Sequence, residues 1–177
     1  KTKERIIEII NEMVVINKNR TLSRKNVVVE DRFIDNELQK SFPYVETLDQ
    51  KQAISDVYKD MSSPGLMDRI IIGDVGFGKT EVAIRAAVRS VCSGGFVIVV
   101  VPTTILADQH YISFKGRLES LGINVRMISR FISKNSKKNV CDEIVDKTVD
   151  ILIGTHAVLS DIIPKKRLSL IIIDEEH

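Results

Sequence analysis

The stretch Ile70-Ile71-Ile72-Gly73-Asp74-Val75-Gly76-Phe77-Gly78-Lys79-Thr80-Glu81 decides the fold class of this chain. The apolar run within residues 69–73 predicts a buried strand, and a helical pattern follows from Glu81 to Val91. A glycine-rich loop between a strand and a helix is typical of a phosphate-binding loop, because the loop N–H groups and the positive end of the helix can both face a polyphosphate. We therefore expect residues 73–81 to bind a nucleotide, with Lys79 bridging the terminal phosphates and Thr80 offering its hydroxyl to magnesium.

The end of the sequence carries a second pattern of this kind. Residues 168–173 are mostly leucine and isoleucine and predict another buried strand, and Asp174 and Glu175 follow it directly. Ligands gather at the carboxyl edge of open parallel sheets, so we expect Asp174 to hold magnesium through water and Glu175 to orient an attacking water. A solvated acidic turn is the alternative explanation of this pair.

Apolar runs and helical patterns alternate along most of the chain. Further strands are expected at residues 96–101, 124–128 and 150–153, so that strand, loop and helix repeat five times from residue 69. This order predicts an α/β fold with a doubly wound parallel sheet. The polar motifs all follow strands, so they should meet at the carboxyl edge of that sheet.

The first 40 residues read differently from the rest. Residues 3–17 and 31–40 predict two helices, the first of them amphipathic, and the break at residues 41–44 contains a proline. We expect a helical connector over residues 1–40 and the main domain over residues 41–177. The apolar stripe of the first helix packs either on the main domain or on another domain.

Composition sets the outer limits of the interpretation. The 177 residues are 44% hydrophobic and 28% charged, which is ordinary for a globular protein, and the net charge of +2 makes any nucleic-acid surface a local patch. Cys92 and Cys141 have no ligand-like spacing and suit reduced thiols. No apolar segment approaches the ~18 residues of a membrane span, and the amino terminus lacks a signal-peptide core, so we expect a cytoplasmic protein without membrane contact.

Five short stretches carry a resemblance to a known family: residues 73–81 (GDVGFGKTE), 101–110 (VPTTILADQH), 127–131 (MISRF), 153–156 (IGTH) and 174–177 (DEEH). Together they resemble the bacterial transcription-repair coupling factors, a family of superfamily-two DNA translocases. The resemblance is dense from residue 41 and thin before it. Related branched-DNA helicases share the phosphate loop and the DEEH-type box, and MISRF favours the coupling factors. The resemblance implies the first RecA-like motor lobe of such a protein, truncated at the DEEH box.

The family assigns roles that the residues alone leave open. It implies ATP and magnesium as ligands, with Gln50 on the adenine and Phe42 or Tyr44 stacked on the base; burial in the core is the alternative for both aromatic residues. It implies that Glu176 and His177 transmit the nucleotide state to the DNA-binding side. The implied contacts with nucleic acid are Thr103, Thr104, Arg130, Thr155 and His156. Without the family, the threonines at 103 and 104 and His156 would be interpreted as ordinary helix or turn caps.

The same resemblance implies partners and a limit on activity. Double-stranded DNA is the expected substrate track, RNA polymerase would bind a domain upstream of this segment, and nucleotide excision repair proteins would bind the intact protein. Because a second lobe supplies arginine fingers in such motors, we expect this chain alone to bind ATP weakly and hydrolyse it negligibly.

Three other functions stay open at this point. The first is the motor lobe of a branched-DNA helicase. The second is a GTPase-like binding switch, which is disfavoured because the sequence has neither an Asn-Lys-x-Asp loop nor an Asp-x-x-Gly sequence. The third is a passive docking lobe, for which Lys79→Ala would leave every activity of the intact protein unchanged.

Overall fold

A computed structural model describes residues 28, 31–74, 76–129, 134–164 and 166–175 of the chain. The expected helix over residues 3–17 lies outside this part, as do four residues with expected roles: Val75, Arg130, Glu176 and His177. Within the described residues no helix is both long enough and apolar enough to cross a membrane.

Four parallel strands form one sheet with the order β2-β3-β1-β4. Their bounds are β1 Phe96–Val100, β2 Val125–Ile128, β3 Ile151–Gly154 and β4 Leu168–Ile173. The two central strands, β1 and β3, are buried along their whole length, which explains why they read as unbroken apolar runs in the sequence. The doubly wound parallel fold expected from the sequence is confirmed.

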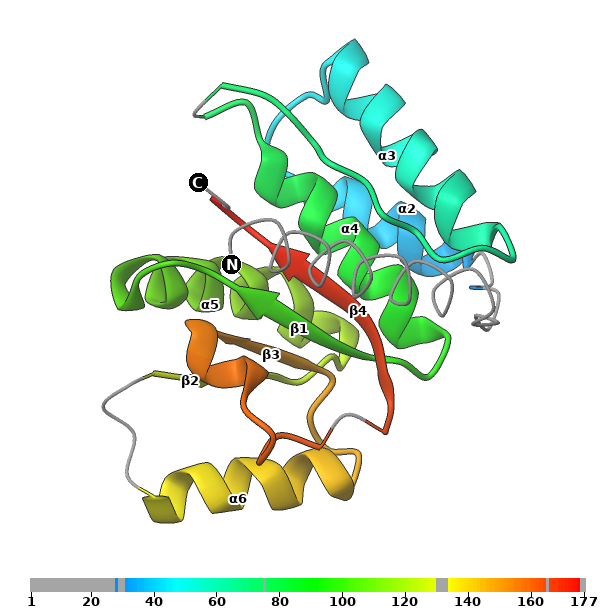
Figure 1. Cartoon of the computed structure of the whole chain (residues 1–177). Coiled ribbons are helices and arrows are strands. Elements are labelled where there is room, and N and C mark those ends of the chain that lie inside the picture. Colours follow the sequence, from blue (N-terminus) through cyan, green and yellow to red (C-terminus); the bar gives the residue numbers. More distant parts are fainter. Residues whose placement is uncertain (1–27, 29–30, 75, 130–133, 165, 176–177) are drawn as a thin grey trace, which may run out of the picture.

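Helices connect the strands and cover both faces of the sheet (Figure 1). Their bounds are α2 Arg32–Lys40, α3 Leu48–Ser62, α4 Lys79–Cys92, α5 Thr104–Leu118 and α6 Lys134–Val145, with short 3₁₀ helices η1 Glu119–Leu121 and η2 His156–Leu159. Side-chain caps define several starts: Asp31 caps α2, Thr47 caps α3 with a full capping box, and Thr103 caps α5.

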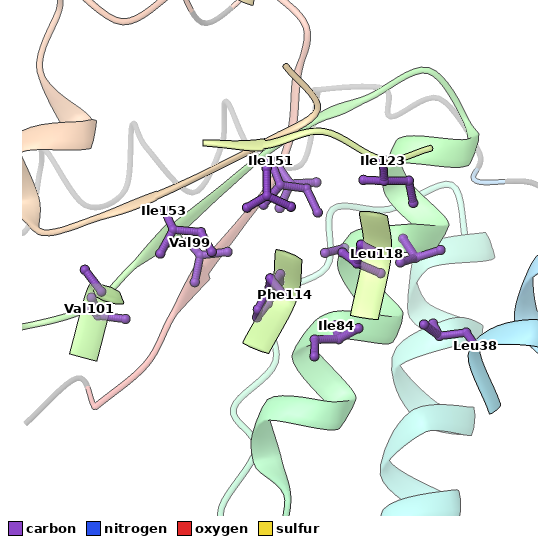
Figure 2. Packing of buried hydrophobic residues seen from close by; sticks show 14 residues of the cluster. Leu38, Ile84, Val99, Val101, Phe114, Leu118, Ile123, Ile151 and Ile153 are labelled. Atoms are coloured by element: carbon purple, nitrogen blue, oxygen red, sulfur yellow. The ribbon is translucent and has the colours of Figure 1, made fainter. Parts of the chain in front are cut away.

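The main core lies between the sheet and helices α4 and α5. Figure 2 shows Val99 and Ile153 of the sheet facing Phe114 of α5, with Ile84 of α4 and Leu38 of α2 further out. A second core on the opposite face joins the sheet to α6 and η2, and a third joins α3 to α4. Helix α2 therefore packs with the main domain. The domain boundary near residue 41 stays a prediction.

Two strand predictions need correction. Residues 69–73 form no strand, and Ile70 and Ile72 are 75% and 91% exposed. The last strand exists, but its residues alternate between partly buried and exposed, and Ile171 and Ile173 face solvent. Among the described strands β4 pairs with β1 alone, so it is an edge strand, and residues 69–73 pair with no described strand. Within the described residues the sheet has four strands rather than the expected five.

Candidate functional site

The phosphate loop ends in a backbone conformation that only glycine adopts easily. Gly76 and Gly78 have φ values of +83° and +74°, and Gly78 is the N-cap of α4. No side chain caps this helix, in contrast to α2, α3 and α5. Among the first residues of α4, the N–H of Glu81 already donates to the carbonyl of Gly78 at 3.0 Å. The uncapped end of the helix still favours an anion through the helix dipole.

Lys79 folds back over the loop that precedes it. Its ammonium group donates to the carbonyl oxygens of Gly73 at 2.6 Å and Asp74 at 2.9 Å. These bonds hold a positive charge against the backbone of the loop. The bridging of terminal phosphates by Lys79 stays a prediction. Engagement of a phosphate would exchange these carbonyl contacts for charge-assisted bonds.

Gln50 links helix α3 to the phosphate loop. Its Oε1 accepts from the backbone N–H of Thr47 at 2.9 Å as part of the capping box, and its Nε2 donates to the carbonyl of Phe77 at 2.8 Å. A Cβ atom on Gly78 would lie too close to this amide nitrogen, so the Gln50 side chain would have to move, while the positive φ itself favours glycine. Both ends of the Gln50 amide therefore already have protein partners. Contact of Gln50 with a base stays a prediction.

A cavity of about 650 Å³ opens beside the loop. Its wall includes Phe42, Tyr44, Gln50, the loop residues 76–78 and Thr80. Phe42 and Tyr44 contact each other edge to face with ring centroids 5.6 Å apart, and Tyr44 is 75% exposed. The alternative that both aromatic residues are core is therefore wrong for Tyr44. A cavity of this size with aromatic walls suits a planar base.

A buried ionic network supports the floor of this cavity. The carboxylate of Glu81, which is 3% exposed, accepts from Arg85 at 2.8 Å and from Arg117 at 2.7 Å. Arg85 also pairs with Glu46, so the positive charges of two arginines balance the negative charges of two glutamates. Glu81 was expected as a ligand contact; its carboxylate oxygens instead bind arginines that hold α4 against its neighbours.

Asp174 lies at the carboxyl end of β4, where its N–H donates to the carbonyl of Val100 at 3.0 Å. Its Oδ2 is 2.8 Å from Nε2 of His110, and this hydrogen bond is the main reason that the pKa of Asp174 lies below its ordinary value. The charge of Lys79 makes the smallest of the contributions that lower this pKa. Glu175 follows with an unusual φ of +55° and an exposed side chain.

The oxygen groups at this edge fit the preferences of magnesium. Thr80 offers a hydroxyl and Asp174 an ionised carboxylate, and magnesium in such sites takes one or two protein ligands and completes its shell with phosphate and water. No group of three or more histidine, cysteine or acidic side chains within the described ranges could hold a metal without such help. The donor set therefore suits magnesium brought with a polyphosphate and does not suit a closed structural metal site.

The expected nucleic-acid contacts follow β1 and β3 at the same edge of the sheet. Thr103 is exposed, and its hydroxyl accepts from the N–H of Leu106 at 3.2 Å, so the helix-cap interpretation is confirmed for it. Thr104 is half-buried, His156 is exposed, and Thr155 is only 6% exposed. Of these four, Thr103 and His156 are the most accessible to a phosphate.

Two residues of this site, His110 and Arg117, received no role from the sequence. His110 lies on the buried stripe of α5 with Ala107, Phe114 and Leu118, and a polar residue on that stripe was the available signal. Arg117 lies near the end of the same helix and gave no such signal, because basic residues are common in the last turn of a helix.

With this geometry in view, comparison with known proteins defines the class. The sequence pattern of the DEAD/DEAH box helicases matches residues 47–177, and the chain belongs to this family. Over almost its whole length it is similar to the transcription-repair-coupling factor of Borreliella burgdorferi, with 44% identity over 175 residues that cover 99% of this chain. The transcription-repair-coupling factor of Haemophilus influenzae is 42% identical over all 177 residues. The resemblance drawn from five short stretches is confirmed.

The fold is also that of a solved relative. The structure of RecG bound to a three-way DNA junction matches 92% of this chain with a TM-score of 0.84 and 33% identity. The present chain spans only 16% and 15% of the two coupling factors and 22% of the RecG chain. It therefore corresponds to one segment of much larger proteins.

Proposed function

We propose that this chain binds ATP with magnesium and forms the first motor lobe of an ATP-dependent double-stranded DNA translocase. The observation that carries the proposal is that helix α5 contacts both halves of the site: His110 is 2.8 Å from the Asp174 carboxylate, and Arg117 is 2.7 Å from Glu81 beside the phosphate-loop threonine. A loop lysine and a strand-end carboxylate are the pair that nucleotide hydrolysis uses. Family membership over residues 47–177 supports the same class.

Each residue has a distinct task in this proposal. The N–H groups of residues 73–81 and the start of α4 receive the phosphates, and Lys79 neutralises their charge. Thr80 and Asp174 would hold magnesium, which supplies charge stabilisation at the transferring phosphate. Glu175 orients the attacking water, while Phe42, Tyr44 and Gln50 surround the base.

The whole-protein activity is proposed from the coupling-factor relatives. In this proposal the intact protein moves along double-stranded DNA and acts on stalled RNA polymerase in transcription-coupled repair in the cytoplasm, and it recruits excision repair proteins. Thr103, Thr104, Arg130, Thr155 and His156 form the DNA side, and Glu176 and His177 link it to the nucleotide. Residues 1–40 serve as the connector and residues 41–177 as the lobe.

A binding measurement on the 177-residue chain tests the nucleotide site. A fluorescent ATP analogue, mant-ATP, is titrated with magnesium present, and Lys79→Ala should weaken binding at least about tenfold because a charge-assisted phosphate contact is lost. The matched control is Lys40→Ala, a lysine whose side chain is 74% exposed on α2. Equal displacement by GTP would favour a binding switch, and unchanged binding by Lys79→Ala would refute the site.

A branched-DNA helicase is the second candidate, and the RecG match favours it. The two candidates predict different substrates for the intact protein. A translocase of the coupling-factor type displaces RNA polymerase from a duplex and leaves a synthetic three-way junction paired. A helicase of the RecG type unwinds the junction.

A further inference from the structure

His110 makes the most specific side-chain contact of the candidate site. It is 64 residues away from Asp174 in sequence, yet its Nε2 lies 2.8 Å from Oδ2 of that carboxylate. The ring is 6% exposed and packs at a tilt against Phe114, with centroids 6.1 Å apart. Its orientation is therefore fixed by the buried face of α5.

Carboxylate oxygens accept hydrogen bonds, so Nε2 of His110 is the donor in this contact. Nδ1 is buried and has no hydrogen-bond partner among the described residues. The ring thus makes a single polar contact in that part of the chain, and this contact is directed at the carboxylate that the proposed function assigns to magnesium.

The backbone alone does not fix this carboxylate. The N–H of Asp174 extends the ladder to Val100, but the strand ends at Ile173, and Glu175, which follows Asp174, has a positive φ. A side chain just beyond a strand end can rotate about χ1 unless something holds it. His110 is a rigid donor on a packed helix, so it selects one orientation of Oδ2.

We propose that His110 is a positioning residue that holds the Asp174 carboxylate in the orientation needed for magnesium, with helix α5 as its support. The inference rests on the proposed nucleotide site and adds to it a residue that does not touch the ligand itself. Helix α5 supports both ends of that site, because Arg117 near its end also contacts Glu81 beside Thr80. Partners that orient a metal ligand typically contribute about 10–100-fold to metal affinity or activity.

The test measures how much magnesium improves the binding of mant-ATP to the 177-residue chain. The affinity is determined with magnesium and with a chelator for the parent chain, His110→Leu, His110→Asn and His110→Gln. Leucine removes the donor, asparagine is too short to reach, and the glutamine amide places a donor near the position of Nε2. Gln109→Leu, an exposed neighbour on the same helix, is the control.

We expect His110→Leu and His110→Asn to reduce the magnesium-dependent gain in affinity about tenfold, with the chelator values unchanged and the glutamine variant close to the parent. Circular dichroism melting identifies any variant that fails to fold. If His110→Leu fails to fold, the magnesium-dependent gain in affinity is compared between His110→Asn and His110→Gln instead. If folded His110→Asn or His110→Leu shows the same magnesium-dependent gain in affinity as the parent chain, the positioning role is overturned while the nucleotide site stands. A parent chain without magnesium-dependent binding overturns the proposed function and, with it, this inference.

Discussion

Arg117 of α5 pairs with Glu81 of α4 immediately after the phosphate-loop threonine, with Nη1 2.7 Å from Oε2. The same guanidinium donates to the carbonyl of Leu38 at 2.9 Å and to the hydroxyl of Ser41 at 3.0 Å. It also lies over the ring of Phe42, 5.4 Å from its centroid. One side chain therefore joins the phosphate-loop helix to the segment that carries the aromatic wall of the cavity.

Breaking this pair should affect both stability and nucleotide binding. Arg117→Leu leaves the Glu81 carboxylate with Arg85 alone and removes the donors to the end of α2. The free energy of unfolding should therefore fall by about 3 kcal/mol, as for buried pairs that lose one partner. The affinity for mant-ATP should also fall, because Phe42 loses the cation above its ring. Urea unfolding and fluorescence titration measure the two effects.

The control for this pair is Glu37→Gln, which removes the exposed ion pair with Lys40 on α2. An exposed pair contributes about 0–1 kcal/mol, so this variant should unfold close to the parent chain. If Arg117→Leu unfolded no more easily than the control, the network would contribute nothing to the cavity wall. A double-mutant cycle with Glu81→Gln then isolates the coupling between the two residues.

Gly78→Ala should abolish nucleotide binding with only a modest loss of stability. The residue has φ +74°, and a Cβ atom would overlap the Gln50 amide that holds the loop. Gly94→Ala is the matched control, because its φ is +80° and a Cβ atom would meet nothing within 4 Å. Both variants should lose about 1–2 kcal/mol from backbone strain, while only the first loses affinity for mant-ATP. Equal affinity in the two variants would contradict the role of Gln50 in shaping the loop.

Tyr58 should make the stability of the fold fall at alkaline pH. Burial raises the pKa of Tyr58 above the ordinary value of 10.0. The neighbouring Asp35 carboxylate, which accepts a hydrogen bond from the Tyr58 hydroxyl at 3.0 Å, raises this pKa further. The folded state therefore holds the proton more tightly than the unfolded state, so this stabilisation is complete below pH 10 and is lost as the pH rises toward the folded pKa.

The measurement is the free energy of unfolding between neutral pH and the alkaline limit of the fold. Tyr58→Phe should show a shallower alkaline decline than the parent chain, whereas Tyr44→Phe, at a residue that is 75% exposed, should follow the parent. Identical declines for the parent and Tyr58→Phe would show that the tyrosine proton is not held by the fold.

Periodicity and motif spacing predicted the fold class because central parallel strands leave an unmistakable signal. Strands β1 and β3 are buried on both faces, so their sequences contain only apolar residues and glycine. The phosphate contact of Lys79 stays a prediction, whereas the loop glycines were predictable, since positive φ restricts which residues can stand there. Contacts such as His110 to Asp174 were not, because they join residues 64 apart and depend on how α5 lies on the sheet.

The same reasoning fails at the edge of the sheet. The run at residues 70–72 is as apolar as β1, but a strand exists only where another strand pairs with it, and composition does not reveal the partner. The connector over residues 1–40 stays a prediction, and helix α2 within it buries Leu38 fully in the main core. In both places long-range packing decides what the local sequence leaves open.

The status of residues 69–73 gives the last prediction, which separates an apolar sequence from a buried strand. Ile72→Ala should change the free energy of unfolding of the 177-residue chain by less than about 0.5 kcal/mol, because the side chain is 91% exposed and loses no packing. Ile98→Ala in β1 should cost about 2–5 kcal/mol, since that side chain is fully buried and leaves a cavity. Urea unfolding of both variants makes the comparison. A loss of more than about 2 kcal/mol for Ile72→Ala would mean that this segment is packed as the sequence suggested, because only burial produces a cost of that size.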